Sequence, residues 1–314
     1  MAYNSVSTPR FYINVPEWLA STGAATLDQP FQEHLRTLPV KLWDSKDADG
    51  NAVLTDNQIN LPSLQGMTAN GFVAVLGHNY GDNEGYYRLK YPDNSNVDVT
   101  SVINGGNYPS YSGFSISTFT GDNTITDFLV SQSSDQLGSI VIGTYFDMPH
   151  SPDLNLTISY ETGTKNIETR GGASLSNTIW RPPIWGNLAQ WELASAGAST
   201  NNQALAHSSR RTWSLSFSFL DKTNTFPEYN ALNKLADNDD SNDEEETILT
   251  SDNFMSQVWN RVGTALPFIF QPDASGGGTD VPEFAICKIA GNSLNIKQVG
   301  FGLYTIKLKI IEAF

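Results

Sequence analysis

The chain has 314 residues, 39% of them hydrophobic and 11% aromatic, which is enough for two domains with substantial cores. Its 18 basic and 33 acidic residues give a formal net charge of −15, and the basic residues are scattered along the chain. Binding to DNA, RNA or an anionic membrane is therefore disfavoured, because such partners are recognised by clustered Lys and Arg.

The lack of a recognisable targeting signal and the single cysteine lead us to expect folding in a cytoplasm. No apolar run approaches the roughly 20 residues that a membrane-spanning helix needs. Residues 1–10 lack the charged and apolar regions of a signal peptide, so we expect the protein to be made and folded in a cytoplasm. Cys287 is the only cysteine, which excludes an intrachain disulfide and a cysteine metal cluster. Its apolar neighbours indicate a small, half-buried strand residue rather than a nucleophile.

A mainly β chain in three segments is predicted. Residues 1–20 form an N-terminal arm, in which the β-prone stretch 10–15 is stopped by Pro16. Residues 21–165 form a jelly-roll or β-sandwich domain, because short apolar stretches alternate there with Gly, Asn, Asp and Ser turns. The expected strands of this domain cover residues 40–43, 71–79, 86–91, 125–130, 139–146 and 154–160, and a short helix is expected over 30–38.

Residues 45–56 have some features of a calcium loop. With Gly50 at position six, Asp47 and Asp49 take positions three and five, but position one is Ser45. No flanking helices are evident, so a polar Asp-Gly turn is the better interpretation.

The pattern breaks around residues 163–172, where we place the boundary to a second β-domain over residues 166–314. This segment is predicted to be an antiparallel β-sandwich or barrel with two short helices, one after Thr225 and one over 251–261 that Gly263 stops. Its clearest strand alternates apolar residues with serines, and the apolar set is Trp213, Leu215, Phe217 and Phe219.

The last stretch, residues 302–312, also alternates with the period of a strand. One side carries Tyr304, Ile306, Leu308 and Ile310, and the other carries Leu303, Thr305, Lys307 and Lys309. We expect this strand to close the sheet of the second β-domain with its apolar side buried. Lys307, Lys309 and Trp213 are candidate assembly contacts. The lysines would meet an acidic neighbour, such as the acidic run 237–246 of an adjacent subunit, which otherwise reads as a solvated loop.

No catalytic constellation stands out. The four histidines are far apart in the sequence, so local spacing does not form a zinc site. His78 follows an apolar strand, but a Gly-x-Ser-x-Gly elbow is missing from the sequence. Glu84, Asp122 and Asp127 are candidate glycosidase carboxylates, although nothing fixes two of them at a catalytic separation. We therefore predict that the protein is not an enzyme and uses no cofactor or metal.

A glycan-binding surface is the alternative that the residues leave open. His78 and Asn79 at a strand end, with Tyr108 and Tyr111 in a polar loop, could contact a sugar by stacking and hydrogen bonding. Tyrosines in such a loop more commonly bury their rings, so both interpretations remain.

The order of motifs in the C-terminal half resembles a known class of proteins. The motifs are Thr169-Arg170-Gly171-Gly172, Pro182-Pro183-x-Trp185-Gly186, Arg211-x-Trp213-x-Leu215-x-Phe217, residues 266–273 and residues 284–288. Over residues 165–314 the chain is similar to tail-tip virion proteins of tailed bacteriophages, of the distal-tail or baseplate-adaptor type. Residues 72–79, 87–89 and 140–143 look similar to galactose-binding-like jelly rolls of phage virion proteins.

This resemblance implies a structural protein of the virion tail, assembled in the host cytoplasm. Such proteins form rings with copies of themselves, commonly hexameric, that link the tail tube to hub, fibre or other tail-tip proteins, and a peripheral β-domain can reach host surface glycans. In many distal tail proteins the ring-forming part comes first. Here the order of the two parts is reversed, or the jelly roll is an insertion after residues 11–15. The alternative function is a glycan-binding host-adhesion protein.

Overall fold

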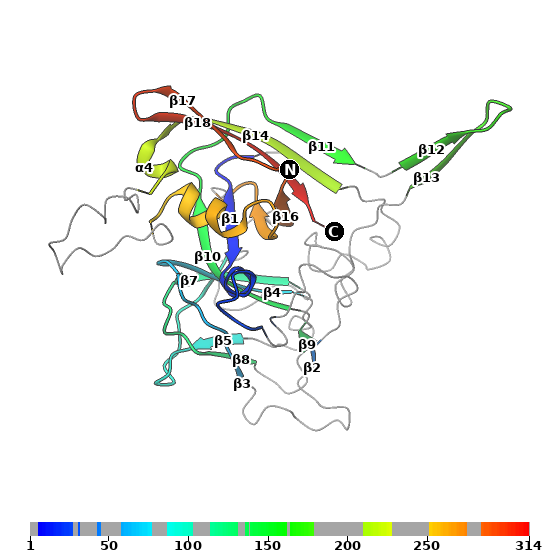
Figure 1. The fold of residues 1–314 in the computed structure, drawn as a ribbon. Coiled ribbons are helices and arrows are strands. Elements are labelled where there is room, and N and C mark those ends of the chain that lie inside the picture. The colour runs from blue at the N-terminus through cyan, green and yellow to red at the C-terminus, as the bar shows by residue number, and fades with distance from the viewer. Residues whose placement is uncertain are drawn as a thin grey trace.

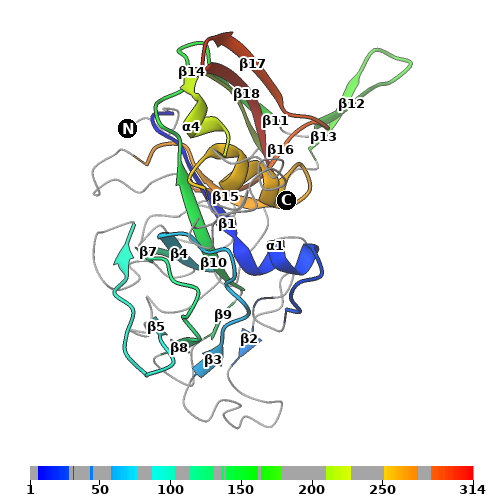
Figure 2. The same ribbon diagram turned by 60° about the vertical axis from the view of Figure 1, so that its left-hand side comes forward.

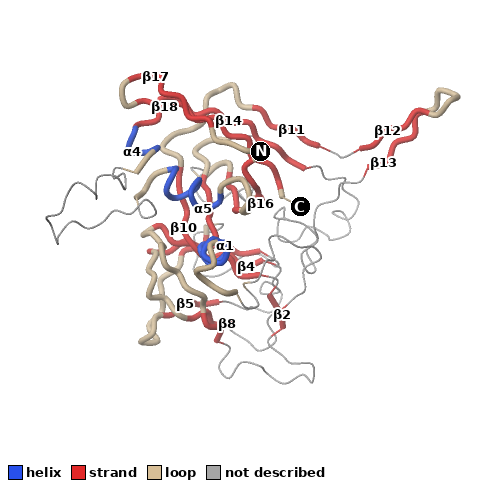
Figure 3. The backbone as a smooth tube through the Cα atoms, viewed as in Figure 1, coloured by secondary structure: helices blue, strands red, loops and turns tan. Residues whose placement is uncertain are grey.

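The computed structural model describes residues 6–27, 31, 43–44, 58–76, 87–102, 114–130, 136–137, 139–161, 164–178, 210–227, 251–274 and 284–313. This part of the chain is mainly β, as predicted, and its strand pairs are antiparallel (Figures 1 and 3). Short helical segments are also present, so the predicted fold class is confirmed. The helices expected over 30–38 and after Thr225 fall largely outside the described residues.

Most strands belong to one long sheet, and the others form three smaller sheets. The long sheet contains β1 (Arg10–Asn14), β4 (Asn70–Leu76), β6 (Thr100–Ser101), β7 (Phe114–Thr120), β10 (Ser139–Asp147), β11 (Thr157–Glu161), β14 (Arg210–Asp221), β15 (Phe268–Gln271), β16 (Ala285–Ile289), β17 (Asn295–Gly300) and β18 (Leu303–Glu312). The other strands are β2 (Trp43–Asp44), β3 (Gln58–Asn60), β5 (Tyr87–Lys90), β8 (Asp127–Val130), β9 (Gln136–Leu137), β12 (Thr164–Glu168) and β13 (Ser174–Thr178). The helical segments are α1 (Val15–Ser21), α4 (Lys222–Thr225), η2 (Met255–Trp259) and α5 (Asn260–Val262).

The long sheet joins the N-terminal and C-terminal halves through β1. Its order is β11-β14-β18-β16-β15-β1-β10-β4-β7-β6, and β17 pairs with the outer part of β18. The stretch that the sequence places in an N-terminal arm is therefore the central strand, with β10 on one side and β15 on the other. The two predicted β-domains share this sheet, and their boundaries stay a prediction.

Strand β1 is central because its side chains are apolar on both faces. Phe11 and Ile13 face one layer of the core and Tyr12 faces the other, and all three are buried. Pro16 ends the strand as expected, but it also begins α1, since a proline in the first helical turn loses no hydrogen bond. The apolar face of α1 then packs Trp18 and Leu19 into the core.

One face of the long sheet is covered by two different elements. At the β4–β10 end, the three-stranded sheet β3-β8-β5 packs Ile59, Leu89 and Phe128 against it, which gives a sandwich (Figure 2). At the β14–β18 end, η2 and α5 pack Phe254, Val258 and Val262 against it. The sequence-predicted helix over 251–261 is thus confirmed in its apolar face and in its stop at Gly263, which has a φ of 51°.

Strand β14 contains a change of phase that the sequence pattern does not reveal. Trp213, Leu215 and Phe217 are buried as predicted, but Phe219 is 70% exposed and Leu220 is buried instead. The pairing with β18 shifts between Phe217 and Leu220, and Phe219 has a φ of 61°. An extra residue in one strand of a pair turns the following side chains to the opposite face, so the prediction for Phe219 is wrong.

Strand β18 has the predicted alternation. Ile306, Leu308 and Ile310 are buried in the core under η2, whereas Lys307 and Lys309 are exposed. It pairs with β14 along one edge and with β17 and then β16 along the other. The strand is therefore inside the sheet of the C-terminal half rather than at its edge.

Candidate functional site

The surface that stands out is a hairpin that projects from the sheet, formed by β12, β13 and the turn between them (Figure 1). We call residues 164–178 the projecting hairpin. Every residue from 164 to 177 is exposed. Ile167 and Leu175 lie opposite one another in its register and are 55% and 59% exposed. A two-stranded hairpin is marginally stable alone in water, so exposed apolar side chains here indicate a surface built to be covered.

The hairpin has two unlike faces. Because strand residues alternate, the pair Ile167–Leu175 shares its face with the pair Lys165–Asn177. The opposite face is polar, and Ser176 donates a hydrogen bond to Asn166 there, with 2.6 Å between Oγ and Oδ1. The sequence signal for this element is weak, and the pattern break at 163–172 was interpreted as a domain boundary. The turn at Gly172, with a φ of 82°, is what allows the chain to reverse.

Four lysines from β16, β17 and β18 lie on the face of the sheet that points away from η2. The register pairs Lys307 with Asn295 and Lys297 with Thr305, so these side chains share one face of the sheet. Lys309 belongs to the same face by alternation, and Lys288 does so through its pairing with Ile311. We call Lys288, Lys297, Lys307 and Lys309 the basic face. Lys307 and Lys309 thus lie where the sequence predicts, in a chain with a net charge of −15.

The third candidate assembly residue, Trp213, is on the opposite face of the same sheet. It is 1% exposed, and its ring packs edge-on against Phe270 with 5.3 Å between centroids. Any influence of Trp213 on assembly therefore passes through the packing of the sheet.

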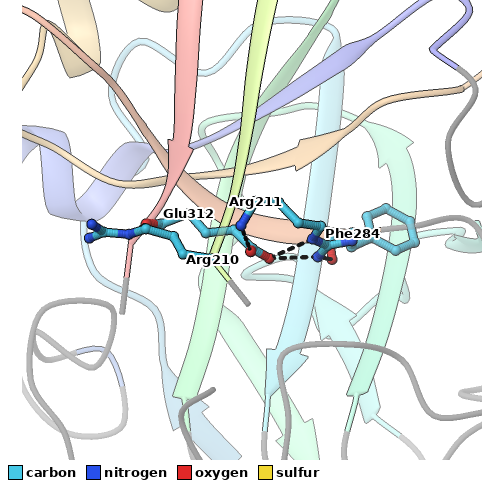
Figure 4. A network of polar contacts seen from close by, with 4 residues as sticks. All are labelled: Arg210, Arg211, Phe284 and Glu312. Atoms are coloured by element: carbon cyan, nitrogen blue, oxygen red, sulfur yellow. Dashed lines mark hydrogen bonds and ion pairs between the residues drawn. The ribbon is translucent and has the colours of Figure 1, made fainter. Parts of the chain in front are cut away.

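Under the sheet, Arg211 and Glu312 form a buried ion pair (Figure 4). Their side chains are 6% and 5% exposed, and Arg211 Nη2 lies 2.6 Å from Glu312 Oε1. The fully buried Cys287 is close enough to this pair for the two charges to affect its pKa. Burial raises the pKa of the Cys287 thiol, and the Glu312 carboxylate raises it further. A thiol held protonated in this way is a weak nucleophile. Cys287 is a strand residue as predicted, but it is fully buried rather than half-buried.

The candidate glycosidase carboxylates have local structural contacts. Asp122 accepts hydrogen bonds from the backbone N–H and the hydroxyl of Thr124, both at 2.8 Å, and so forms a turn. Asp127 begins β8 and accepts a hydrogen bond from Thr126 Oγ1 at 2.7 Å. Glu84 lies outside the described residues, and so do the four candidate glycan contacts His78, Asn79, Tyr108 and Tyr111. The calcium-like loop 45–56 and the acidic run 237–246 lie outside them as well.

Within the described residues, no group of three or more His, Cys, Asp or Glu side chains is arranged to hold a metal ion. None of the helices in this part of the chain has the length and apolar character to cross a membrane. Comparisons with family models, with curated proteins and with solved structures found no match for this chain. The residues themselves therefore carry the functional argument.

Proposed function

We propose that this protein is a structural component of a phage tail tip, of the distal-tail or baseplate-adaptor type, that assembles with copies of itself. The observation that carries the proposal is the projecting hairpin, whose apolar pair Ile167 and Leu175 faces solvent in the single chain. An element of this kind gains its stability from a neighbour. The resemblance of residues 165–314 to tail-tip proteins supplies the biological setting.

The open edges of the long sheet support self-assembly. In the described chain, the sheet ends at β11, and β17 pairs on one side only with β18. Edge strands offer unpaired backbone groups to another chain, and a repeated subunit can use them to continue the sheet around a ring. The expected ring is a hexamer that contacts the tail tube and hub or fibre proteins.

Buried polar contacts between distant parts of the chain also support a scaffold role. Its polar side chains serve the fold: Arg261 donates hydrogen bonds to Thr144 and to the carbonyl of Gly66, and it lies over the ring of Trp18. Arg211 and Glu312 hold two strands together. These contacts connect distant parts of the body from which the hairpin extends.

Electron microscopy tests the proposal. The purified full chain should form rings in negative stain, with a matching mass by mass photometry, and an antibody against it should label the tail tip of virions. Rings with the label elsewhere on the particle would overturn the tail-tip position. A monomer at all concentrations, absent from virions, would overturn the whole proposal.

A further inference from the structure

The exposed large apolar side chains of the described chain lie in two places: the part of the sheet around β11, β14 and β18, and the projecting hairpin. Seven large apolar residues are exposed in the described chain, and they lie on the loops and strands around β11, β14 and β18 or on the projecting hairpin. They are Leu154, Tyr160, Ile167, Leu175, Phe219, Val299 and Phe301. Surfaces of this kind mark interaction sites when they are grouped.

Three of these residues lie around one end of β18, and we call them the end patch: Phe219, Val299 and Phe301. Phe219 is the bulged residue of β14, opposite β18 between the partners of Ile306 and Tyr304. Val299 and Phe301 lie at the turn that joins β17 to β18, and Phe301 is 103% exposed. The three residues flank the same end of β18 from its two sides.

The projecting hairpin leaves the sheet at the other end. Strand β11 runs antiparallel to β14 and ends at Glu161, opposite Arg210, just before the hairpin. Phe219 is nine residues further along β14, which corresponds to about 30 Å of strand. In Figure 1 the hairpin projects at the upper right, and the turn between β17 and β18 is at the upper left. One chain therefore has two apolar features at opposite ends and cannot bring them together.

Charged side chains lie around both features. Lys165 shares the apolar face of the hairpin, and Arg170 is in its turn. Asp221 ends β14 beside the end patch, where hydrogen bonds from the backbone and hydroxyl of Thr223 lower its pKa and keep it ionised at neutral pH. Asp153 hydrogen-bonds Ser218 next to Phe219. Lys222 and Lys297 also lie near the end patch, so its surroundings carry both signs of charge. The complementary pairing is that of Lys165 on the hairpin with Asp221 or Asp153 beside β14.

We infer that the projecting hairpin of one copy docks, through Ile167 and Leu175, on the end patch of a second copy of this chain. The contact joins two different surfaces, so a bound pair still offers one free hairpin at one end and one free end patch at the other. Head-to-tail contacts of this type close into a ring when the rotation between copies permits. This contact specifies how copies would meet in the proposed assembly. Closure into a ring rests on the proposed function, but the contact itself can be tested without virions.

Site-directed cross-linking tests the contact. Ile167→Cys and Phe301→Cys are made as single variants of the full chain, mixed in equal amounts and treated with a short bismaleimide. We expect a covalent dimer from the mixture and at least tenfold less from either variant alone. The double variant should give a ladder of cross-linked species. Wild type controls for Cys287, which is fully buried, and Ser176→Cys on the opposite hairpin face should replace Ile167→Cys poorly.

The outcomes separate the contact from the function. Strong cross-linking of either single variant with itself would indicate a two-fold interface and overturn the inference. Rings at the tail tip without cross-links from the mixture would also overturn it and leave the proposed function standing. Head-to-tail cross-links in a chain that is absent from virions would keep the inference and overturn the proposed function. Both substituted sites are exposed, and matching thermal unfolding curves verify that the variants fold.

Discussion

Glu312 accepts three hydrogen bonds from Arg211, one from its backbone and two from its guanidinium. Glu312 Oε2 lies 2.6 Å from the Arg211 backbone nitrogen, and Oε1 lies 2.9 Å from Nε and 2.6 Å from Nη2. Arg210 adds a bond from its Nε to the Glu312 carbonyl at 2.8 Å (Figure 4). The final strand is thereby fixed to the start of β14, although the two residues are 101 positions apart.

Removing one partner of this pair should be strongly destabilising. Glu312→Ala removes the carboxylate that pairs with the buried Arg211 cation, so we expect the free energy of unfolding to fall by about 3–5 kcal/mol. Urea denaturation followed by tryptophan fluorescence measures the change.

Two further variants serve as controls for that prediction. Arg211→Met with Glu312→Leu removes both charges and should cost far less than the single change, because no unpaired charge remains. Asp147→Ala breaks the Arg10–Asp147 pair, whose carboxylate is 41% exposed, and should cost roughly 0.2–1 kcal/mol. An equal loss in Glu312→Ala and Asp147→Ala would contradict the argument.

Stability should decline in alkaline solution, starting with Cys287. Burial raises the pKa of Cys287 above its ordinary value of 9.0 and those of Tyr12 and Tyr87 above 10.0. Above these values the unfolded chain has released protons that the folded chain keeps, so rising pH favours unfolding. Cys287→Ala should reduce this decline above pH 9 by up to about 1.4 kcal/mol per pH unit.

Urea titrations in steps of pH measure that decline. The pKa of Arg261 is lowered to about 10 by burial. Above that pH the folded state loses its proton before the unfolded state does, which acts in the opposite direction. The effect of Cys287 on the alkaline decline is therefore measured most clearly between pH 9 and about pH 10. Tyr87→Phe should flatten the curve only above it, and an unchanged slope in Cys287→Ala would show that the thiol does not titrate on unfolding.

A methyl group at Gly143 should disrupt the central strands. A Cβ there would meet the carbonyl oxygen of Ile13 at 2.0 Å and the backbone nitrogen of Val15 at 2.7 Å. Neither atom can move without breaking the β1–β10 pairing. We expect Gly143→Ala to cost roughly 3 kcal/mol or more in thermal or urea unfolding. Gly171→Ala, where a Cβ meets nothing within 4 Å, should be close to neutral.

The apolar pair of the projecting hairpin should be needed for assembly but not for folding. Ile167→Ser with Leu175→Ser should raise the dissociation constant of self-assembly at least tenfold, about 1.4 kcal/mol. The thermal unfolding midpoint of the monomer should stay the same, because both side chains are exposed. Sedimentation velocity measures the dissociation constant of self-assembly, and calorimetry measures the thermal unfolding midpoint. Asn166→Ala with Ser176→Ala changes the opposite face and should assemble normally.

The basic face predicts a salt-dependent contact with an acidic neighbour. Lys307→Glu with Lys309→Glu should weaken assembly at low ionic strength, and the difference from wild type should shrink as salt screens the charges. Light scattering across a salt series measures this effect. Arg88→Glu with Lys90→Glu, on β5 in the other half, makes the same change of charge. If both pairs respond alike, net charge rather than the basic face is responsible.

The strands of the C-terminal half could be predicted because their side chains alternate between an apolar core and solvent. This holds for Ile306, Leu308 and Ile310 on β18 and for Trp213 and Leu215 on β14. It fails at Phe219, because a bulge depends on how two strands pair and leaves no mark in the order of apolar residues. The projecting hairpin escaped prediction for a related reason. Its strands bury neither face in the single chain, so they lack a continuous alternation.

The sequence by itself determined the mainly β class, the alternation of β18 and the placement of Lys307 and Lys309 opposite its buried side, since these depend on local periodicity. Only the tertiary structure decided that β1 lies at the centre of a sheet shared by both halves, because strand order depends on long-range pairing. It also decided that the end patch and the projecting hairpin are at opposite ends of β14. That separation arises from strand pairing and not from neighbouring residues, and it is what makes a head-to-tail contact possible.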